Sequence, residues 1–134
     1  MEKLTIYTMS TCAYCKTIKE ELKKNNIDFV EKLTSDWAEE WDQVVGLASM
    51  PTTPIIHYKE NYFIPGRDFG SPDNLVNILK NFKESKFSES RQALEKIKTL
   101  NYNTATAFTR LDTLIRQIEK NYRELFEDEE TKTE

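Results

Sequence analysis

The sequence has 134 residues, of which 38% are hydrophobic, 31% are charged and two are cysteine. This length allows one compact domain, or one small domain with an appended segment. The net charge of −4 predicts no general attraction to nucleic acid or to an anionic membrane, and no apolar run is long enough to span a membrane. The N-terminus lacks the basic and apolar regions of a signal peptide, so we expect a cytoplasmic protein.

The first part of the chain alternates between strand and helix patterns. Lys3–Thr8 is a short run of β-branched and aromatic residues, which predicts a strand. Ala13–Lys24 has apolar residues four apart and predicts a helix that ends at Asn25-Asn26, two residues suited to a left-handed helix end. Ile27–Leu33 shows partial alternation and predicts the second strand.

A second helix is expected to start at Ser35 or Asp36, either of which can cap it, and to run to about Leu47. Trp37 and Trp41 lie at helical spacing within it. Two tryptophans this close resemble a ligand platform, but aromatic residues at helical spacing are more often part of the core. We therefore expect both rings to be buried.

The next segment predicts a hairpin followed by a helix. Ile55–Tyr58 and Tyr62–Ile64 are strand-like and are joined by a polar turn. Ser71 then offers a capping hydroxyl, and Pro72 suits the first position of a helix. The order βαβαββα predicts an α/β domain over residues 1–83, with a four-stranded mixed sheet flanked by helices.

Residues 84–134 have a different character, without glycine or proline, and predict a helical extension with a frayed acidic end. Its apolar residues are spaced 3, 4, 3, 4, 3, as in a heptad repeat: Phe108, Leu111, Ile115, Ile118, Tyr122 and Leu125. The polar run from Asn101 to Thr104 either interrupts one long helix or turns between two antiparallel helices, and we narrowly prefer the hairpin. The apolar residues must be buried against the domain, the other helix or a second copy of the chain, so a homodimer through this tail is one expectation.

Cys12 and Cys15, the only two cysteines, follow the first strand in a C-x-x-C motif. At a helix start, this spacing allows a disulfide and places the first sulfur near unpaired backbone N–H groups, which favour a thiolate. Cys12 is expected to attack and the more buried Cys15 to resolve the mixed disulfide. A zinc site needs four ligands, and His57 alone adds to the two cysteines, so no metal site is expected.

Thr53-Pro54 precedes the third predicted strand. A Thr-Pro bond can be cis, and the backbone of Thr53 would then face outward and could pair with an extended peptide. Alternatively, Pro54 simply marks the start of the strand.

Taken in order, these motifs resemble those of the glutaredoxins, which have a thioredoxin-like fold. The matching segments are Cys12-Ala13-Tyr14-Cys15, Thr53-Pro54 and Gly70-Ser71-Pro72-Asp73-Asn74, and they span residues 1–83. The resemblance implies a glutathione-dependent dithiol–disulfide oxidoreductase that reduces protein disulfides or glutathione mixed disulfides. It also implies a set of glutathione-binding residues: Tyr14, Thr53, Pro54, Gly70, Ser71 and Asp73.

The chain departs from this family at two positions near the dithiol. Many relatives have lysine where Met9 stands, and proline where Ala13 stands. Without this lysine, the site lacks a cation near the thiolate and the bound glutathione. Arg67 and Lys16 are candidates to replace it. Some relatives with a small residue after the first cysteine assemble a [2Fe–2S] cluster between two subunits, which is a less favoured expectation here.

Two other functions stay open. One is a redoxin that is reduced by thioredoxin reductase and donates electrons to ribonucleotide reductase, because the last motif is similar to that of small glutaredoxin-like redoxins with this role. The other is an adaptor that is derived from a redoxin and oligomerises through its tail.

Overall fold

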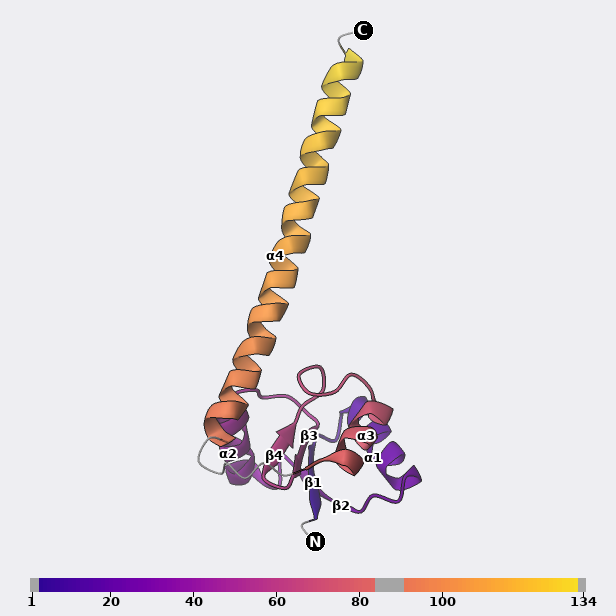
Figure 1. Ribbon diagram of the computed structural model, residues 1–134, viewed down its shortest axis with the longest axis vertical. Helices are drawn as coiled ribbons and strands as arrows, with labels where there is room; N and C mark the ends of the chain where they lie inside the picture. The colour runs from indigo at the N-terminus through magenta and orange to yellow at the C-terminus, as the bar shows by residue number, and fades with distance from the viewer. Residues whose placement is uncertain (1–2, 84–90, 133–134) are drawn as a thin grey trace. The chain divides into compact units, whose positions relative to one another are not determined.

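In the computed structural model, which describes residues 3–83 and 91–132, four strands form one mixed sheet (Figure 1). The strands are β1 (Leu4–Thr8), β2 (Phe29–Leu33), β3 (Ile55–Tyr58) and β4 (Asn61–Phe63), in the spatial order β2-β1-β3-β4. β1 pairs in parallel with β2 and antiparallel with β3, and β3 forms an antiparallel hairpin with β4. This is the thioredoxin-like arrangement that the sequence predicts.

Alternation along the strands divides the core into two layers, because successive side chains point to opposite faces of a sheet. On one face, Ile6, Ile56 and Phe63 pack with helices α1 (Ala13–Lys24) and α3 (Pro72–Asn81). On the other face, Tyr7, Ile55 and Ile64 pack with α2 (Ala38–Ala48). The sheet therefore lies between two helical layers.

Local signals set the ends of α1 and α3. Cys12 caps the N-terminus of α1, and Asn26 follows its end in the left-handed conformation, with φ 57°. At α3, the Ser71 side chain accepts a hydrogen bond from the Asn74 N–H at 3.2 Å, and Pro72 occupies the first turn. A side chain thus caps the N-terminus of each helix, and α1 ends at a pair of asparagines suited to a helix end.

The start of α2 differs from the prediction. Neither Ser35 nor Asp36 caps it, because the chain first makes a turn in which the N–H groups of Asp36 and Trp37 donate to the Leu33 carbonyl. Trp37 is the capping residue, without a side-chain cap, and 48% of it is exposed. The expectation of a buried Trp37 is wrong, whereas Trp41 packs against the second core layer.

The tail contains one helix, α4 (Arg91–Lys132), that continues through Asn101 and Thr104. The preferred helical hairpin is therefore wrong, because a few polar residues cost a helix only tenths of a kcal/mol each when glycine and proline are absent. The compact units are Met1–Thr99 and Leu100–Glu134. The predicted division after residue 83 adjoins residues 84–90, which lie outside the described part of the chain.

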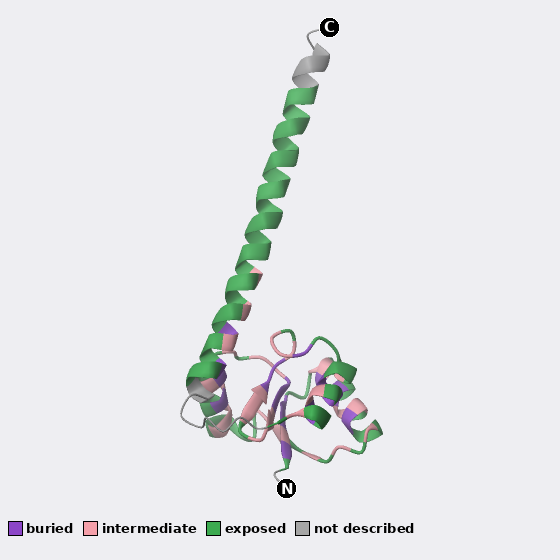
Figure 2. Cartoon of the chain, viewed as in Figure 1, coloured by how far each residue is buried: buried purple, intermediate pink, exposed green. Residues whose placement is uncertain are grey.

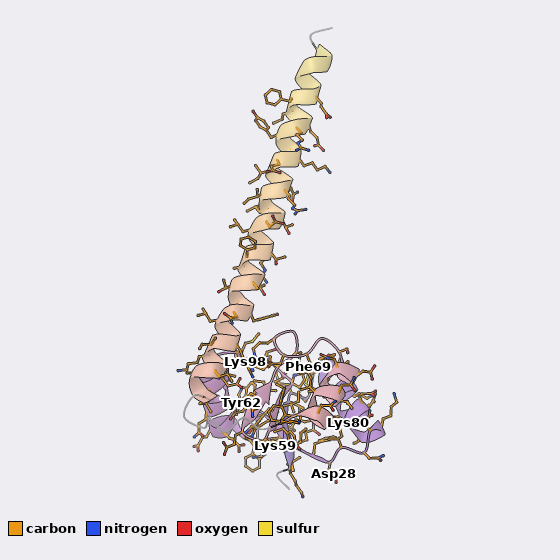
Figure 3. The ribbon with its side chains drawn as sticks, viewed as in Figure 1. Asp28, Lys59, Tyr62, Phe69, Lys80 and Lys98 are labelled. Carbon is orange, nitrogen blue, oxygen red and sulfur yellow. A yellow bond between two sulfur atoms is a disulfide. The ribbon has the colours of Figure 1, made fainter. Side chains whose placement is uncertain are left out.

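The first turns of α4 belong to the first unit and are attached to it by buried charges, here called the Arg67 clasp. The Arg67 side chain is only 1% exposed, and its guanidinium contacts the carboxylates of Asp68 at 2.7 Å and Glu95 at 2.6 Å. It also donates to the Tyr62 carbonyl and to the Thr99 hydroxyl. Figure 3 labels Tyr62 and Lys98, which lie at this attachment.

The Thr99 hydroxyl extends the clasp by donating to the carbonyl of Ala48, the last residue of α2. Residues 95 and 99 thus complete the fold of the first unit, although their side chains are polar. None of the described helices has the length and apolarity needed to cross a membrane.

Candidate redox site

The topology places three loops at one edge of the sheet. β4 runs in the same direction as β1, since each is antiparallel to β3. The ends of β1 and β4, which lead into α1 and α3, therefore lie at the same edge as the start of β3. This edge holds Cys12, the Thr53-Pro54 peptide and Ser71.

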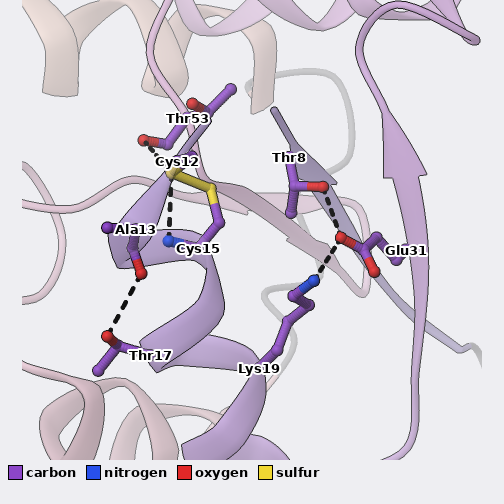
Figure 4. Close-up of a disulfide and its surroundings, with 8 residues drawn as sticks. All are labelled: Thr8, Cys12, Ala13, Cys15, Thr17, Lys19, Glu31 and Thr53. Atoms are coloured by element: carbon purple, nitrogen blue, oxygen red, sulfur yellow. Dashed lines mark hydrogen bonds and ion pairs between the residues drawn. A yellow bond between two sulfur atoms is a disulfide. The ribbon is translucent and has the colours of Figure 1, made fainter. Parts of the chain in front are cut away.

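Cys12 and Cys15 form a disulfide across the first turn of α1, with their Cα atoms 5.3 Å apart (Figure 4). The Sγ of Cys12 accepts a hydrogen bond from the Cys15 N–H at 3.1 Å. The first turn of α1 contains no acidic residue that would oppose a thiolate. In the reduced protein, the backbone donor and the positive end of the helix dipole both favour the ionised form of Cys12.

The two sulfurs differ in access. Cys12 is half-buried, whereas Cys15 is 1% exposed. An incoming disulfide can therefore reach Cys12 more readily than Cys15. This is the difference in exposure that the sequence predicts.

Thr53 supplies the backbone opposite the dithiol. The Thr53-Pro54 peptide bond is cis, as the sequence allows, and Pro54 is buried. The Thr53 carbonyl oxygen lies 3.9 Å from the Sγ of Cys12. A peptide linked through its sulfur to Cys12 would thus lie beside the Thr53 backbone.

The other residues proposed for glutathione belong to the first turn of α1 and to the start of α3. Tyr14 is half-buried and packs against the first core layer, so only part of its ring is available to a ligand. Gly70, Ser71 and Asp73 are exposed at the start of α3, where backbone N–H groups can bind an anion. The Gly70 N–H itself donates to the Asn74 side chain at 3.2 Å.

A polar cluster supports the dithiol helix from β1 and β2. Glu31 accepts hydrogen bonds from Lys19 of α1 at 2.6 Å and from Thr8 at the end of β1 at 2.7 Å (Figure 4). The hydrogen bond from Lys19 is the main reason that the pKa of Glu31 lies below its ordinary value, although burial opposes it. This cluster joins α1 to the strands directly before the C-x-x-C motif.

The structure rules out one of the two candidate cations. Arg67 is held in the clasp, where its guanidinium is buried among Asp68, Glu95 and Thr99. It therefore does not take the place of the missing lysine, whose position Met9 occupies with 49% of its surface exposed. Lys16, exposed in the first turn of α1, stays a candidate.

Sequence reasoning missed one neighbour of the site, the loop 34–37. Its Thr34 N–H donates to the Thr8 carbonyl at 3.0 Å, which holds the loop beside the end of β1. Trp37 is exposed there, with the Lys32 ammonium 4.3 Å from its ring centroid. Parallel pairing of the first two predicted strands was the signal that could have placed this loop at the dithiol edge.

The fold and the dithiol together define a class of protein: a thiol–disulfide redoxin with a thioredoxin-like fold. Comparison with known proteins agrees, because the family model described as Glutaredoxin matches residues 4–63. An uncharacterized glutaredoxin-like 8.6 kDa protein in the rubredoxin operon of Clostridium pasteurianum is 34% identical over 61 residues, which cover 46% of this chain and 81% of that protein. The chain belongs to the glutaredoxin family.

Proposed function

We propose that this protein is a glutathione-dependent dithiol–disulfide oxidoreductase. The observation that supports this proposal best is the position of Cys12, whose sulfur accepts a backbone N–H at the start of α1 and faces the Thr53 carbonyl. These are the features that a nucleophilic thiolate and an aligned substrate peptide need. The reducing cytoplasm is the proposed location.

In the proposed reaction, the Cys12 thiolate attacks one sulfur of a protein disulfide or a glutathione mixed disulfide and releases the other sulfur as a thiolate. For a protein substrate, Cys15 then attacks the mixed disulfide, which releases the second substrate thiol and leaves the Cys12–Cys15 disulfide. Two glutathione molecules reduce this disulfide and leave as oxidised glutathione. Thr53, Tyr14 and the start of α3 would position the glutathione.

Two single substitutions test the roles of the cysteines. Cys12→Ser is expected to abolish turnover with both substrates, because it removes the attacking sulfur. Cys15→Ser is expected to retain reduction of a glutathione mixed disulfide and to lose most reduction of a protein disulfide, because only the latter needs the resolving thiol. Turnover coupled to glutathione reductase measures both, and activity in Cys12→Ser would contradict the assignment.

A second function differs in the electron donor: thioredoxin reductase would reduce the dithiol, which would then reduce ribonucleotide reductase. Two observations favour it, namely Met9 in place of the lysine and the enclosure of Arg67 in the clasp. Both leave the site with less positive charge for the carboxylates of glutathione.

The reduction potential of the Cys12–Cys15 couple discriminates these functions. A value of roughly −200 to −230 mV supports coupling to glutathione, whereas a value near roughly −270 mV supports coupling to thioredoxin reductase. Equilibration with glutathione redox buffers, followed by thiol alkylation, measures the potential. Direct rates of reduction by glutathione and by thioredoxin reductase provide the independent check.

A [2Fe–2S] cluster shared between two subunits is the less favoured proposal for this chain. Such clusters are held by cysteine thiolates, and Cys15 is buried behind Cys12. One chain would thus offer a single accessible thiolate, so the remaining ligands would come from glutathione and a second subunit. We expect a colourless protein after anaerobic reconstitution with iron and sulfide.

A further inference from the structure

The second unit presents an apolar seam along α4, defined here as Phe108, Leu111, Ile115, Ile118, Tyr122 and Leu125. These residues alternate three and four apart, which makes them the a and d positions of a heptad repeat. Between 46% and 72% of each residue is exposed, and Figure 2 shows the exposure of this helix. An apolar seam of this regularity is normally covered.

The surface of the same helix outside the seam already has the character of a water-facing surface. Arg116 forms an ion pair with Asp112 at 3.0 Å, and Lys120 lies 3.9 Å from Glu124, both at i, i+4 spacing. Such pairs support an exposed helix face, but each contributes only tenths of a kcal/mol. The helix therefore needs its seam to be packed, because most helical stability in proteins comes from the apolar face.

The seam is large enough for a stable association. Its six residues expose about 700 Å² per helix if a full residue surface is about 200 Å². Two such faces amount to about 1,400 Å², which lies within the range of about 1,200–2,000 Å² for specific interfaces. Leu114, beside the seam and 56% exposed, widens the apolar surface.

A second copy of the same chain matches the seam best in a parallel alignment. The next a position upstream is Asn101. In a parallel pair its side-chain amide faces the amide of Asn101 in the second chain, and the two amides can hydrogen-bond to each other. In an antiparallel alignment that overlaps residues 101–125 fully, Asn101 would face Leu125. A buried amide against an apolar side chain is left unpaired, which is costly.

The flanking charges also favour the parallel pair. Asp112 and Glu119 occupy e positions, and in a parallel coiled coil they face the g positions of the partner helix, which are Ala107 and Leu114. In an antiparallel pair, e positions face e positions, so Asp112 would lie against another acidic residue. Like charges in this position are destabilising.

We propose that residues 101–125 form a parallel, two-stranded coiled coil with the same segment of a second copy of this chain. Isoleucine at an a position with leucine at d favours two strands, and the chain has Ile115 at a and leucine at two of the three d positions, 111 and 125, with Ile118 at the third. Since the redoxin unit precedes this segment, the coiled coil would join two dithiol sites in one particle. A substrate with two reducible disulfides would then meet the second site at high effective concentration.

Sedimentation equilibrium of the full chain tests the proposal. The expected mass is that of two chains at micromolar concentration, and a mass of one chain, or of three or more, would overturn it. Ile118→Asp, which puts a charge into the seam, is expected to weaken self-association at least about 100-fold, since a buried unpaired carboxylate is so unfavourable. Gln117→Asp is the matched control: it adds the same charge next to Ile118 on the outer face and should leave the mass unchanged.

Cross-linking tests the direction. In a chain carrying Cys12→Ser and Cys15→Ser, Asn101→Cys provides one thiol per chain at the a position directly upstream of the seam. A parallel pair places the two new thiols face to face, so mild oxidation should join the chains. A dimer that does not cross-link contradicts the parallel alignment. Retention of turnover by Ile118→Asp shows that the redoxin unit is folded in that variant.

Discussion

At the scale of single residues, the environment of Cys12 makes a prediction about its acidity. In Cys15→Ser the backbone N–H of residue 15 is kept, so the thiolate of Cys12 can still accept it, as the sulfur does at 3.1 Å here. Together with the helix dipole, this donor is expected to bring the pKa of the Cys12 thiol below about 7.5, as at other helix N-termini. Alkylation rate against pH measures it, and an unshifted value of about 8.5 would contradict this account of the site.

The raised pKa of Tyr7 predicts how the free energy of unfolding changes at alkaline pH. Its hydroxyl donates to Glu40, and burial, followed by this hydrogen bond to a carboxylate, raises its pKa well above the ordinary value. A raised pKa in the folded state means that the stabilisation is fully present below the unfolded pKa of about 10 and is lost as the pH rises above it. The free energy of unfolding should therefore fall at alkaline pH.

Tyr7→Phe should reduce this alkaline loss, because the ionisable hydroxyl is gone. The measurement is urea denaturation of both proteins at neutral pH and above pH 10. Comparing each protein with itself at neutral pH removes the constant cost of the lost hydrogen bond. Tyr62 also has a pKa raised, mainly by burial, so part of the pH dependence should persist in the variant. An equal loss in both proteins would refute the role of Tyr7.

At the scale of elements, what could be predicted depended on whether the signal is local. The ends of α1 follow from Cys12 and from the asparagines after Lys24, which act on their own turn of helix, so these ends were predictable. The pairing of the cysteines was predictable from their spacing, and the fold was predictable from the order of the elements and motifs along the chain. The start of α2 was missed because the turn at Leu33 competes with the caps at Ser35 and Asp36.

The Arg67 clasp could not be predicted from sequence. Arg67 and Glu95 are 28 residues apart, and nothing local to either indicates the other. The same distance explains why Arg67 was a plausible cation for the dithiol site until the structure placed it in the clasp. Long-range pairs of this kind depend on how whole elements pack.

The clasp predicts a cost for losing one of its charges. Glu95 is 3% exposed and 2.6 Å from the guanidinium, so Glu95→Gln leaves a buried arginine with only Asp68 as its ionised partner. Removing one member of a buried pair typically costs about 3–5 kcal/mol, and we expect about 3 here because Asp68 is retained. Urea denaturation measures this loss. Glu20→Gln, which changes an exposed glutamate of α1, should stay within about 0.5 kcal/mol of the wild type.

At the scale of the whole molecule, the division into units decides where the chain can be cut. The first unit extends to Thr99, because Glu95 and Thr99 contact Arg67 and the end of α2. A chain that ends at residue 99 keeps these contacts, whereas one that ends at residue 83 loses them all. Activity alone would not distinguish the two truncations. The dithiol lies in α1 beside the start of β3, and both truncations keep these elements.

Stability does separate them. The 1–99 chain should unfold in urea with the same free energy as the redoxin unit of the full protein, and it should be monomeric if the coiled coil lies beyond it. The 1–83 chain should be less stable by about 3–5 kcal/mol, or insoluble, because Arg67 would be left with Asp68 alone. Equal stability of both truncations would show that the clasp contributes little and that the domain ends before α4. If instead 1–83 is the weaker chain, the first turns of α4 are part of the redoxin fold and only the remainder is free to join two copies.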